Sequence, residues 1–169
     1  MKAEFVGIYI SDDGWPRAVV VLDAGAFAIS IDRPTAVSIL VAARGFPKEA
    51  RELKRLLLHD LMAEIISRGG LSIEKVVIDR ALEIKRIDEG FVTGTIEGAG
   101  LIYSATLHGT DRDGVSFEPL TVRPSDGIAI AVRVGCDIEI ADDVVPKLTL
   151  YDPNEIPFRK LSLREIDKL

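Results

Sequence analysis

The sequence predicts one α+β domain, in which an antiparallel or mixed β-sheet of several strands packs with about three helices. Segments rich in β-branched and aromatic residues recur along the chain, and short turns with glycine or aspartate separate them. Longer segments of helix-forming composition end at a glycine. The 169 residues, 47% of them hydrophobic and 28% charged, are enough for one domain with its own core.

The first part of the chain predicts three strands and a helix. Residues 4–10 are β-branched and aromatic and end at Ser-Asp-Asp-Gly, which indicates a strand and then a turn. Residues 17–23 and 26–32 flank an Ala-Gly turn and predict a hairpin. A helix is expected over 34–45, with a proline in its first turn and a glycine at its end. Its apolar residues lie on nearly every side, so we expect it to be buried or paired with another chain.

The middle of the chain predicts a long helix and a series of strands. Residues 47–70 indicate one helix, or two helices joined near Leu58. Four consecutive antiparallel strands are expected over 73–79, 82–88, 91–97 and 101–107. Around the stretch 120–135, we expect a turn, an extended segment, a short strand and a turn of helix over 109–114, 115–122, 136–141 and 141–145.

The domain is expected to span residues 1–145, followed by a tail over 146–169. Prolines interrupt the tail, and its last segment is too short to be a stable helix alone. We therefore expect the tail to dock on the body of the domain or on a neighbouring subunit.

Composition argues against several classes of site and partner. The net charge of -6 argues against a broad electrostatic grip on nucleic acid, and the 6% of aromatic residues predicts no stacking platform for single strands. Cys136 is the single cysteine, which excludes an internal disulfide and a cysteine zinc cluster; we expect a core residue rather than a thiol acting with His59 or His108. No signal peptide or membrane span is evident, which predicts a cytoplasmic protein. One asparagine and no glutamine indicate a thermophilic source.

The stretch Leu120 to Gly135 contains Arg-Pro-Ser-Asp between an extended segment and a small-residue apolar segment. We expect the strand to run to Arg123 and the helix to start just after Ser125, whose hydroxyl would cap it. Asp126 then lies in the first turn, where the helix dipole favours a negative charge, and Gly135 ends the helix in a left-handed conformation.

Two interpretations of this stretch stay open. It is either a well-capped buried helix or an anion site, in which Arg123 and the helix N-terminus meet a group such as phosphate. Asp126 and Arg133 share a helix face but are seven residues apart. An ion pair between them would be strained, so we expect each to contact something else.

His59-Asp60 is the other candidate. Adjacent helical residues point about 100° apart, so the two side chains need partners from elsewhere. Asp60 and Glu64 share a face and either bind a divalent metal or form a solvated acidic stripe. His59 is either a general acid or base or a hydrogen-bonded structural residue.

Together, LLHDLMAEIISRGG, IEKVVIDR and VRPSDGIAIAVRVGCDIEIADDVV resemble the bifunctional nuclease domain family over residue 4 to about residue 145. The family's motifs are His-Asp opening a helix and Arg-Pro-Ser-Asp-Ala-Ile before an alanine-rich helix that ends in arginine. Some positions depart from the family pattern. Leu56 and Leu58 stand where Pro and Thr are common, the segment 31–36 lacks the usual glutamate, and Gly127 replaces an alanine.

The resemblance implies an α+β domain that is often dimeric, and plant members are associated with cleavage of RNA and DNA. It carries over these site residues: His59, Asp60, Arg123, Ser125, Asp126 and Arg133. In a consistent mechanism, Asp60 and Asp126 bind Mg²⁺ or Mn²⁺ and His59 handles the proton, while the phosphate-binding residues are the two arginines and the serine. The prediction is a metal-dependent nuclease acting on RNA or DNA as a homodimer or higher homo-oligomer. The alternative is a non-catalytic dimeric module that binds a small anion or acts as an interaction protein.

Overall fold

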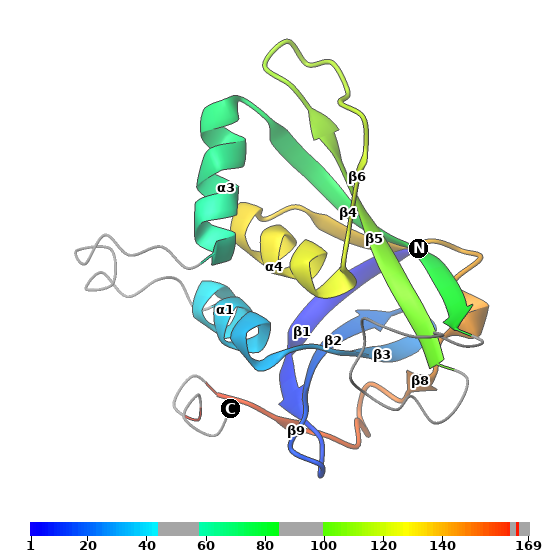
Figure 1. Ribbon diagram of the computed structural model, residues 1–169. Helices are drawn as coiled ribbons and strands as arrows, with labels where there is room; N and C mark the ends of the chain where they lie inside the picture. The colour runs from blue at the N-terminus through cyan, green and yellow to red at the C-terminus, as the bar shows by residue number, and fades with distance from the viewer. Residues whose placement is uncertain (44–57, 85–99, 163–164, 166–169) are drawn as a thin grey trace.

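The computed structural model describes residues 1–43, 58–84, 100–162 and 165, and within these ranges it contains one mixed sheet and three α-helices (Figure 1). The strands are β1 (Lys2–Ile10), β2 (Pro16–Leu22), β3 (Gly25–Ser30), β4 (Ser72–Ile84), β5 (Gly100–Thr110), β6 (Leu120–Val122), β7 (Asp137–Ile140), β8 (Leu150–Tyr151) and β9 (Arg159–Lys160). The helices are α1 (Arg33–Ala43), α3 (Leu58–Gly69) and α4 (Pro124–Val134), with a short 3₁₀ turn, η1 (Val145–Lys147). The predicted α+β class is confirmed.

The sheet has the order β6-β5-β4-β7-β1-β2-β3-β8, and β9 pairs with β1. Every pair is antiparallel except β4 with β7, which makes the sheet mixed. The predicted hairpin is β2–β3, and its turn ends at Gly25, whose φ of +142° favours glycine. A Cβ at this position would also lie 3.0 Å from the carbonyl oxygen of Tyr151, so the glycine lets β8 approach the turn.

The sheet curves around α4. Phe27 of β3 and Tyr103 of β5 make an edge-to-face contact with ring centroids 5.3 Å apart, although four strands separate β3 from β5 in the sheet. Helix α4 contacts β3, β4, β5 and β7, and it packs against both α1 and α3 (Figure 1). The curvature therefore brings the N-terminal end of α4 close to strands from both halves of the sheet.

Small residues let α4 sit deep against the sheet. A Cβ at Gly127 would lie 2.7 Å from Cγ1 of Val76 and 3.4 Å from Cβ of Ala105. The next turn of α4 fills the core with Ile128 and Ile130, both fully buried. Because α4 carries the Arg-Pro-Ser-Asp stretch at its start, this packing fixes the position of the stretch.

Two sequence-based expectations are wrong in detail. Strands predicted over 73–79 and 82–88 are joined in β4, which continues to Ile84 with a register shift between Ile78 and Arg80. Helix α4 begins at Pro124 with Arg123 as N-cap and no side-chain cap, so Ser125 is not the cap. Proline at the first helical position already has a helical φ, which moves the start two residues earlier. The predicted strand over 91–97 and the first half of the helix over 47–70 lie outside the described residues.

The glycine end predicted for the helix after Arg123 is confirmed. Gly135 ends α4 with φ 73° and ψ 30°, in the left-handed region. Helix α1 buries Ala36, Ile39 and Leu40 within the chain. In the tail, β8 pairs with β3, β9 pairs with β1, and Leu161 is buried. No helix in the described part of the chain is long and apolar enough to cross a membrane.

Candidate functional site

The candidate site lies where α1, α3 and α4 meet, and α1 begins beside it. Asp32 directly precedes α1, and its Oδ1 accepts a hydrogen bond of 2.7 Å from the backbone N–H of Thr35. This is the usual N-cap arrangement, which holds the carboxylate at the end of the helix. Its other oxygen, Oδ2, accepts from Nη1 of Arg123 at 3.3 Å.

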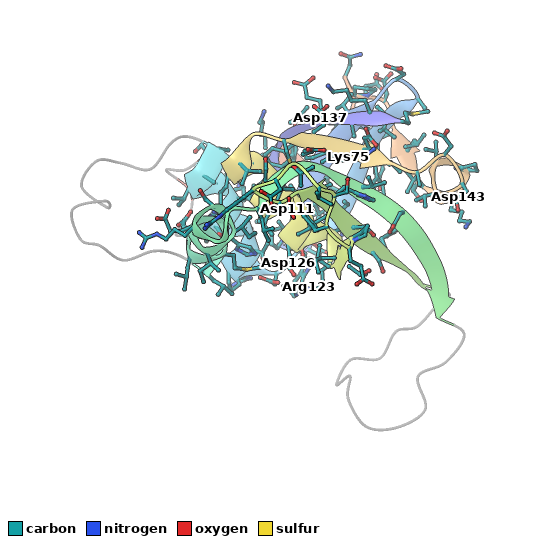
Figure 2. The ribbon with its side chains drawn as sticks, turned by 90° about the horizontal axis from the view of Figure 1, so that it is seen from above. Lys75, Asp111, Arg123, Asp126, Asp137 and Asp143 are labelled. Atoms are coloured by element: carbon teal, nitrogen blue, oxygen red, sulfur yellow. The ribbon has the colours of Figure 1, made fainter. Side chains whose placement is uncertain are left out.

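Arg123 lies at the start of α4 and bridges two carboxylates. Its Nε donates to Oδ2 of Asp126 at 2.7 Å and its Nη2 to Oδ1 of Asp126 at 2.9 Å, which makes the contact bidentate. Figure 2 labels the two residues in a view from above. The side chain of Arg123 is 64% exposed, whereas that of Asp126 is 21% exposed. The guanidinium is therefore the part of the cluster that an incoming anion meets first.

His59 is buried at the start of α3 and joins α1 to α4. Its Nε2 lies 3.3 Å from Oδ1 of Asp126, and its Nδ1 lies 3.0 Å from Oγ of Ser38. A carboxylate only accepts hydrogen bonds, so Nε2 carries a proton. In the neutral ring, Nδ1 then accepts from the hydroxyl of Ser38. The ring is thus held from both sides, and Asp126 is held by His59 and Arg123 together.

Asp60, the next residue, points to a different partner. Its Oδ1 accepts from Nε of Arg133 at 2.7 Å, and the two side chains are 14% and 6% exposed. Arg133 also donates through Nη1 to the carbonyl of Ala129 and through Nη2 to the carbonyl and hydroxyl of Ser38. Four of its five N–H groups are used within the protein. Arg133 is therefore a buried residue whose hydrogen bonds link α1, α3 and α4.

A cavity of about 350 Å³ opens onto part of this cluster. Asp32, Ser38, His59, Arg123 and Asp126 line it, together with the apolar side chains of Leu58 and Met62. Asp60 and Arg133 are not among its lining residues. The structure thus divides the predicted set: His59, Arg123 and Asp126 meet at the cavity, while Asp60 and Arg133 pair behind it.

The electrostatics of the cavity favour charged carboxylates. Burial by itself raises the pKa of Asp126, but hydrogen bonds from Arg123 and His59 outweigh it and hold that pKa below its ordinary value. Burial likewise raises the pKa of Asp32, and the backbone of Thr35 and the Arg123 guanidinium bring it below the ordinary value. Both groups are anions at neutral pH, and Arg123 neutralises part of that charge.

The two predicted metal ligands, Asp60 and Asp126, have different partners in the structure. Asp60 and Asp126 contact different arginines, and each of the two oxygens of Asp126 accepts from Arg123. Among residues 1–43, 58–84, 100–162 and 165, no group of three or more His, Cys, Asp or Glu side chains is placed to hold a metal ion. Glu64, the other predicted ligand, pairs with Arg68.

The residues that line the cavity differ from the sequence-based prediction at three positions. Asp32 and Ser38 line the cavity but were not predicted; a signal for Asp32 was its place as an acidic residue directly before a helix. Ser125 instead lines a second cavity, together with Arg123.

Cys136 is half-buried, and burial raises the pKa of its thiol to about 11, which keeps it protonated at neutral pH.

Comparison with known proteins agrees with the motifs. A sequence model of the bifunctional nuclease domain matches residues 19–152, which include β3, the three described helices and β7. No curated protein matches the chain. The match covers well over half of the 169 residues and contains both the His-Asp and the Arg-Pro-Ser-Asp stretches. The chain therefore belongs to the bifunctional nuclease domain family.

Proposed function

We propose that this chain hydrolyses phosphodiester bonds of RNA or DNA at the cavity lined by Asp32, His59, Arg123 and Asp126. The observation that carries the proposal is the placement of Arg123, a largely exposed guanidinium at the N-terminus of a buried helix, between two carboxylates. A guanidinium presents paired N–H donors that match two phosphate oxygens, and the helix N-terminus adds a favourable dipole. Membership of a nuclease-related family supports the same substrate class.

Arg123 would bind the phosphate by exchanging carboxylate contacts for phosphate oxygens. Its contact with Asp32 is the longer one, at 3.3 Å, and both of those side chains are more than one third exposed. This contact is the easier one to give up, because exposed ion pairs contribute little. The guanidinium would then neutralise the charge that builds up on the phosphoryl oxygens in the transition state.

Asp126 would act as the base once Arg123 has exchanged its contacts with Asp126, as well as the contact with Asp32, for phosphate oxygens. Loss of the Arg123 hydrogen bonds removes a main cause that lowers the pKa of Asp126, so the carboxylate becomes a stronger base when substrate is bound. Asp126 would take a proton from a water molecule whose oxygen bonds to phosphorus as the bond to the leaving oxygen breaks, and the leaving oxygen would take a proton from bulk water. His59 stays on Oδ1 of Asp126 and orients it.

The predicted divalent cation stays a prediction, and the steps above do not depend on it. Asp60 and Asp126, the two predicted ligands, each contact an arginine in the structure. Activity measured after dialysis against EDTA, and again after adding Mg²⁺ or Mn²⁺, decides whether a cation is needed. Activity that disappears with EDTA and returns with the cation would require the carboxylates to rearrange.

The test of the proposed function is cleavage of labelled single-stranded RNA and of single- and double-stranded DNA. We expect Asp126→Asn to lower cleavage by about 10²- to 10⁴-fold, which is the usual effect of removing a general base. Arg123→Lys keeps the charge but loses the paired donors, so it should also lower cleavage. Arg68→Lys is the matched control, because Arg68 is an exposed arginine of α3 that pairs with Glu64 outside the cavity. Equal cleavage by all four proteins would indicate a contaminating nuclease and would refute the proposal.

One observation favours the alternative of a non-catalytic dimeric module. Helix α3 leaves Leu58, Leu61 and Ile65 exposed, and an apolar helix face of this kind is typical of association surfaces. In that case Arg123 would bind a small anion without chemistry. Absence of cleavage, together with saturable phosphate binding that Arg123→Lys weakens, would support the alternative.

A further inference from the structure

A second cavity adjoins the first at the Asp32–Arg123 ion pair. Its volume is about 450 Å³, and both Asp32 and Arg123 line it as well as the first cavity. Its walls come from the end of β3, from β5, from the β1–β2 turn and from the start of α4. This volume is in the range of ordinary small-molecule sites.

Three aromatic side chains line this second cavity. Trp15 comes from the β1–β2 turn and is 49% exposed, so a large part of its ring surface is available to a ligand. Phe27 of β3 and Tyr103 of β5 form the edge-to-face pair that closes the curved sheet. The low aromatic content of the sequence gave no sign of this, because the three residues come from separate strands and turns.

Ser125 supplies an unused polar group in the same cavity. The residue is 7% exposed, lies in the first turn of α4 and lines the cavity. Its hydroxyl has no hydrogen-bond partner within the part of the chain that the structure describes. This oxygen is not one of the buried unpaired side-chain atoms of the described residues, so water or a ligand in the cavity can reach it and form a hydrogen bond with it.

We propose that this second cavity binds a nucleobase of the strand whose phosphate Arg123 holds. The inference rests on the proposed function, since it supplies the base-binding part of the same substrate. Nucleobases stack on aromatic side chains and carry edge groups that accept or donate hydrogen bonds, which fits Trp15, Tyr103 and the Ser125 hydroxyl. Arg123 lines both cavities, so a single nucleotide can reach the guanidinium with its phosphate and the aromatic wall with its base.

The proposal makes single strands the preferred substrate. A base inside a duplex is stacked and paired and would have to be extruded before it entered the cavity. Extrusion breaks the pairing and stacking of the base, so a duplex should be cleaved more slowly than the same sequence as a single strand. No broad basic surface is needed for this mode of binding, which agrees with the net charge of -6.

Binding can be measured apart from cleavage, because Trp15 is the single tryptophan of the chain. AMP and ribose 5-phosphate are titrated into the full chain, and tryptophan fluorescence is recorded. We expect saturable quenching by AMP at a concentration about 5- to 150-fold lower than ribose 5-phosphate requires, since one base stack contributes that much affinity. In Ser125→Ala, which keeps the reporter, AMP should bind about 2- to 10-fold more weakly. Equal affinities for the two ligands, or no quenching by AMP, would overturn the base site.

Cleavage separates failure of the base site from failure of the proposed function. Single-stranded oligonucleotides with and without an abasic position are cleaved by the wild type, by Trp15→Ala and by Tyr9→Ala, an aromatic of β1 outside both cavities. We expect Trp15→Ala to raise KM for the intact strand and Tyr9→Ala to leave it unchanged. If the wild type cleaves abasic and intact strands equally well, the nuclease proposal stands and the base site is refuted. If no strand is cleaved but AMP still quenches Trp15, the nuclease proposal is refuted and the base site stands.

Discussion

Replacement of Arg133, which does not itself line the cavity, by methionine should destabilise the protein. Arg133→Met keeps an unbranched apolar stem but removes four hydrogen bonds, including the one to Asp60. Asp60, whose side chain is 14% exposed, then loses its ion pair with the guanidinium. Removal of one partner of a buried ion pair lowers stability by about 3–5 kcal/mol, because the other charge stays buried.

The size of this effect is large for a domain of this length. Domains have about 5–15 kcal/mol of stability, so the variant should lose a substantial fraction of the total. At about 2–4 °C per kcal/mol for a chain of 150–250 residues, Tm should fall by roughly 6–20 °C. In the double variant Arg133→Met, Asp60→Leu, both charges are replaced by apolar groups, so most of the lost stability should return.

Urea unfolding followed by circular dichroism measures these differences. The control is Arg68→Met, which breaks the Arg68–Glu64 pair on the exposed side of α3, where the side chains are 79% and 47% exposed. We expect the control to lose less than about 1 kcal/mol, the usual value of a surface pair. Two results would show that Arg133 does not stabilise the contact between the helices. One is a loss of unfolding free energy in Arg133→Met no larger than in the control. The other is a double variant whose loss equals the sum of the two single losses within about 0.5 kcal/mol.

Two further predictions concern acid stability and the packing of α4. Arg123 helps to hold the pKa values of Asp32 and Asp126 below their ordinary values, so both carboxyl groups bind fewer protons in the folded than in the unfolded chain. The stability that they contribute is therefore present above about pH 4 and is lost as the pH falls below it. Arg123→Gln should therefore lose less stability than the wild type between about pH 5 and pH 2 by thermal unfolding, and parallel curves would contradict this. Gly127→Ala should force Val76 to shift and lower stability by up to about 2 kcal/mol despite better helix propensity. Val76→Ala, Gly127→Ala should be more stable than Val76→Ala alone; a less stable double variant would show that the methyl group is not accommodated.

The strand and helix content follows from the sequence wherever local signals agree. The β2–β3 hairpin and the glycine end of α4 have short-range causes, and both form as predicted. The misread strand β4 has a long-range cause. Strand β4 continues through a register shift relative to β5 between Ile78 and Arg80. A single sequence does not distinguish such an irregularity within one strand from a break between two strands.

The start of α4 shows a conflict between two local rules. Serine favours the N-cap position and proline favours the first helical position, and these differ by two residues in Arg-Pro-Ser-Asp. The proline rule wins, and Ser125 becomes part of the first turn with its hydroxyl toward the second cavity. Neither rule predicts that Ser125 lines a cavity, because residues of β3 and β5 form the rest of its wall.

The His-Asp and Arg-Pro-Ser-Asp motifs are assigned to one site from the sequence, and the contacts between them show why. His59 and Asp60 are neighbours in the chain but point apart, and on α4 their partners Asp126 and Arg133 lie two turns apart on one face. The two motifs thus form two contacts along the α3–α4 interface. The His59–Asp126 contact borders the cavity, whereas the Asp60–Arg133 contact does not. A match to both motifs therefore indicates how two helices pack as much as it indicates a catalytic site. Chemistry needs a group that substrate can reach, and in this cluster the side chain that satisfies that condition most clearly is Arg123, 64% exposed, rather than Arg133, 6% exposed.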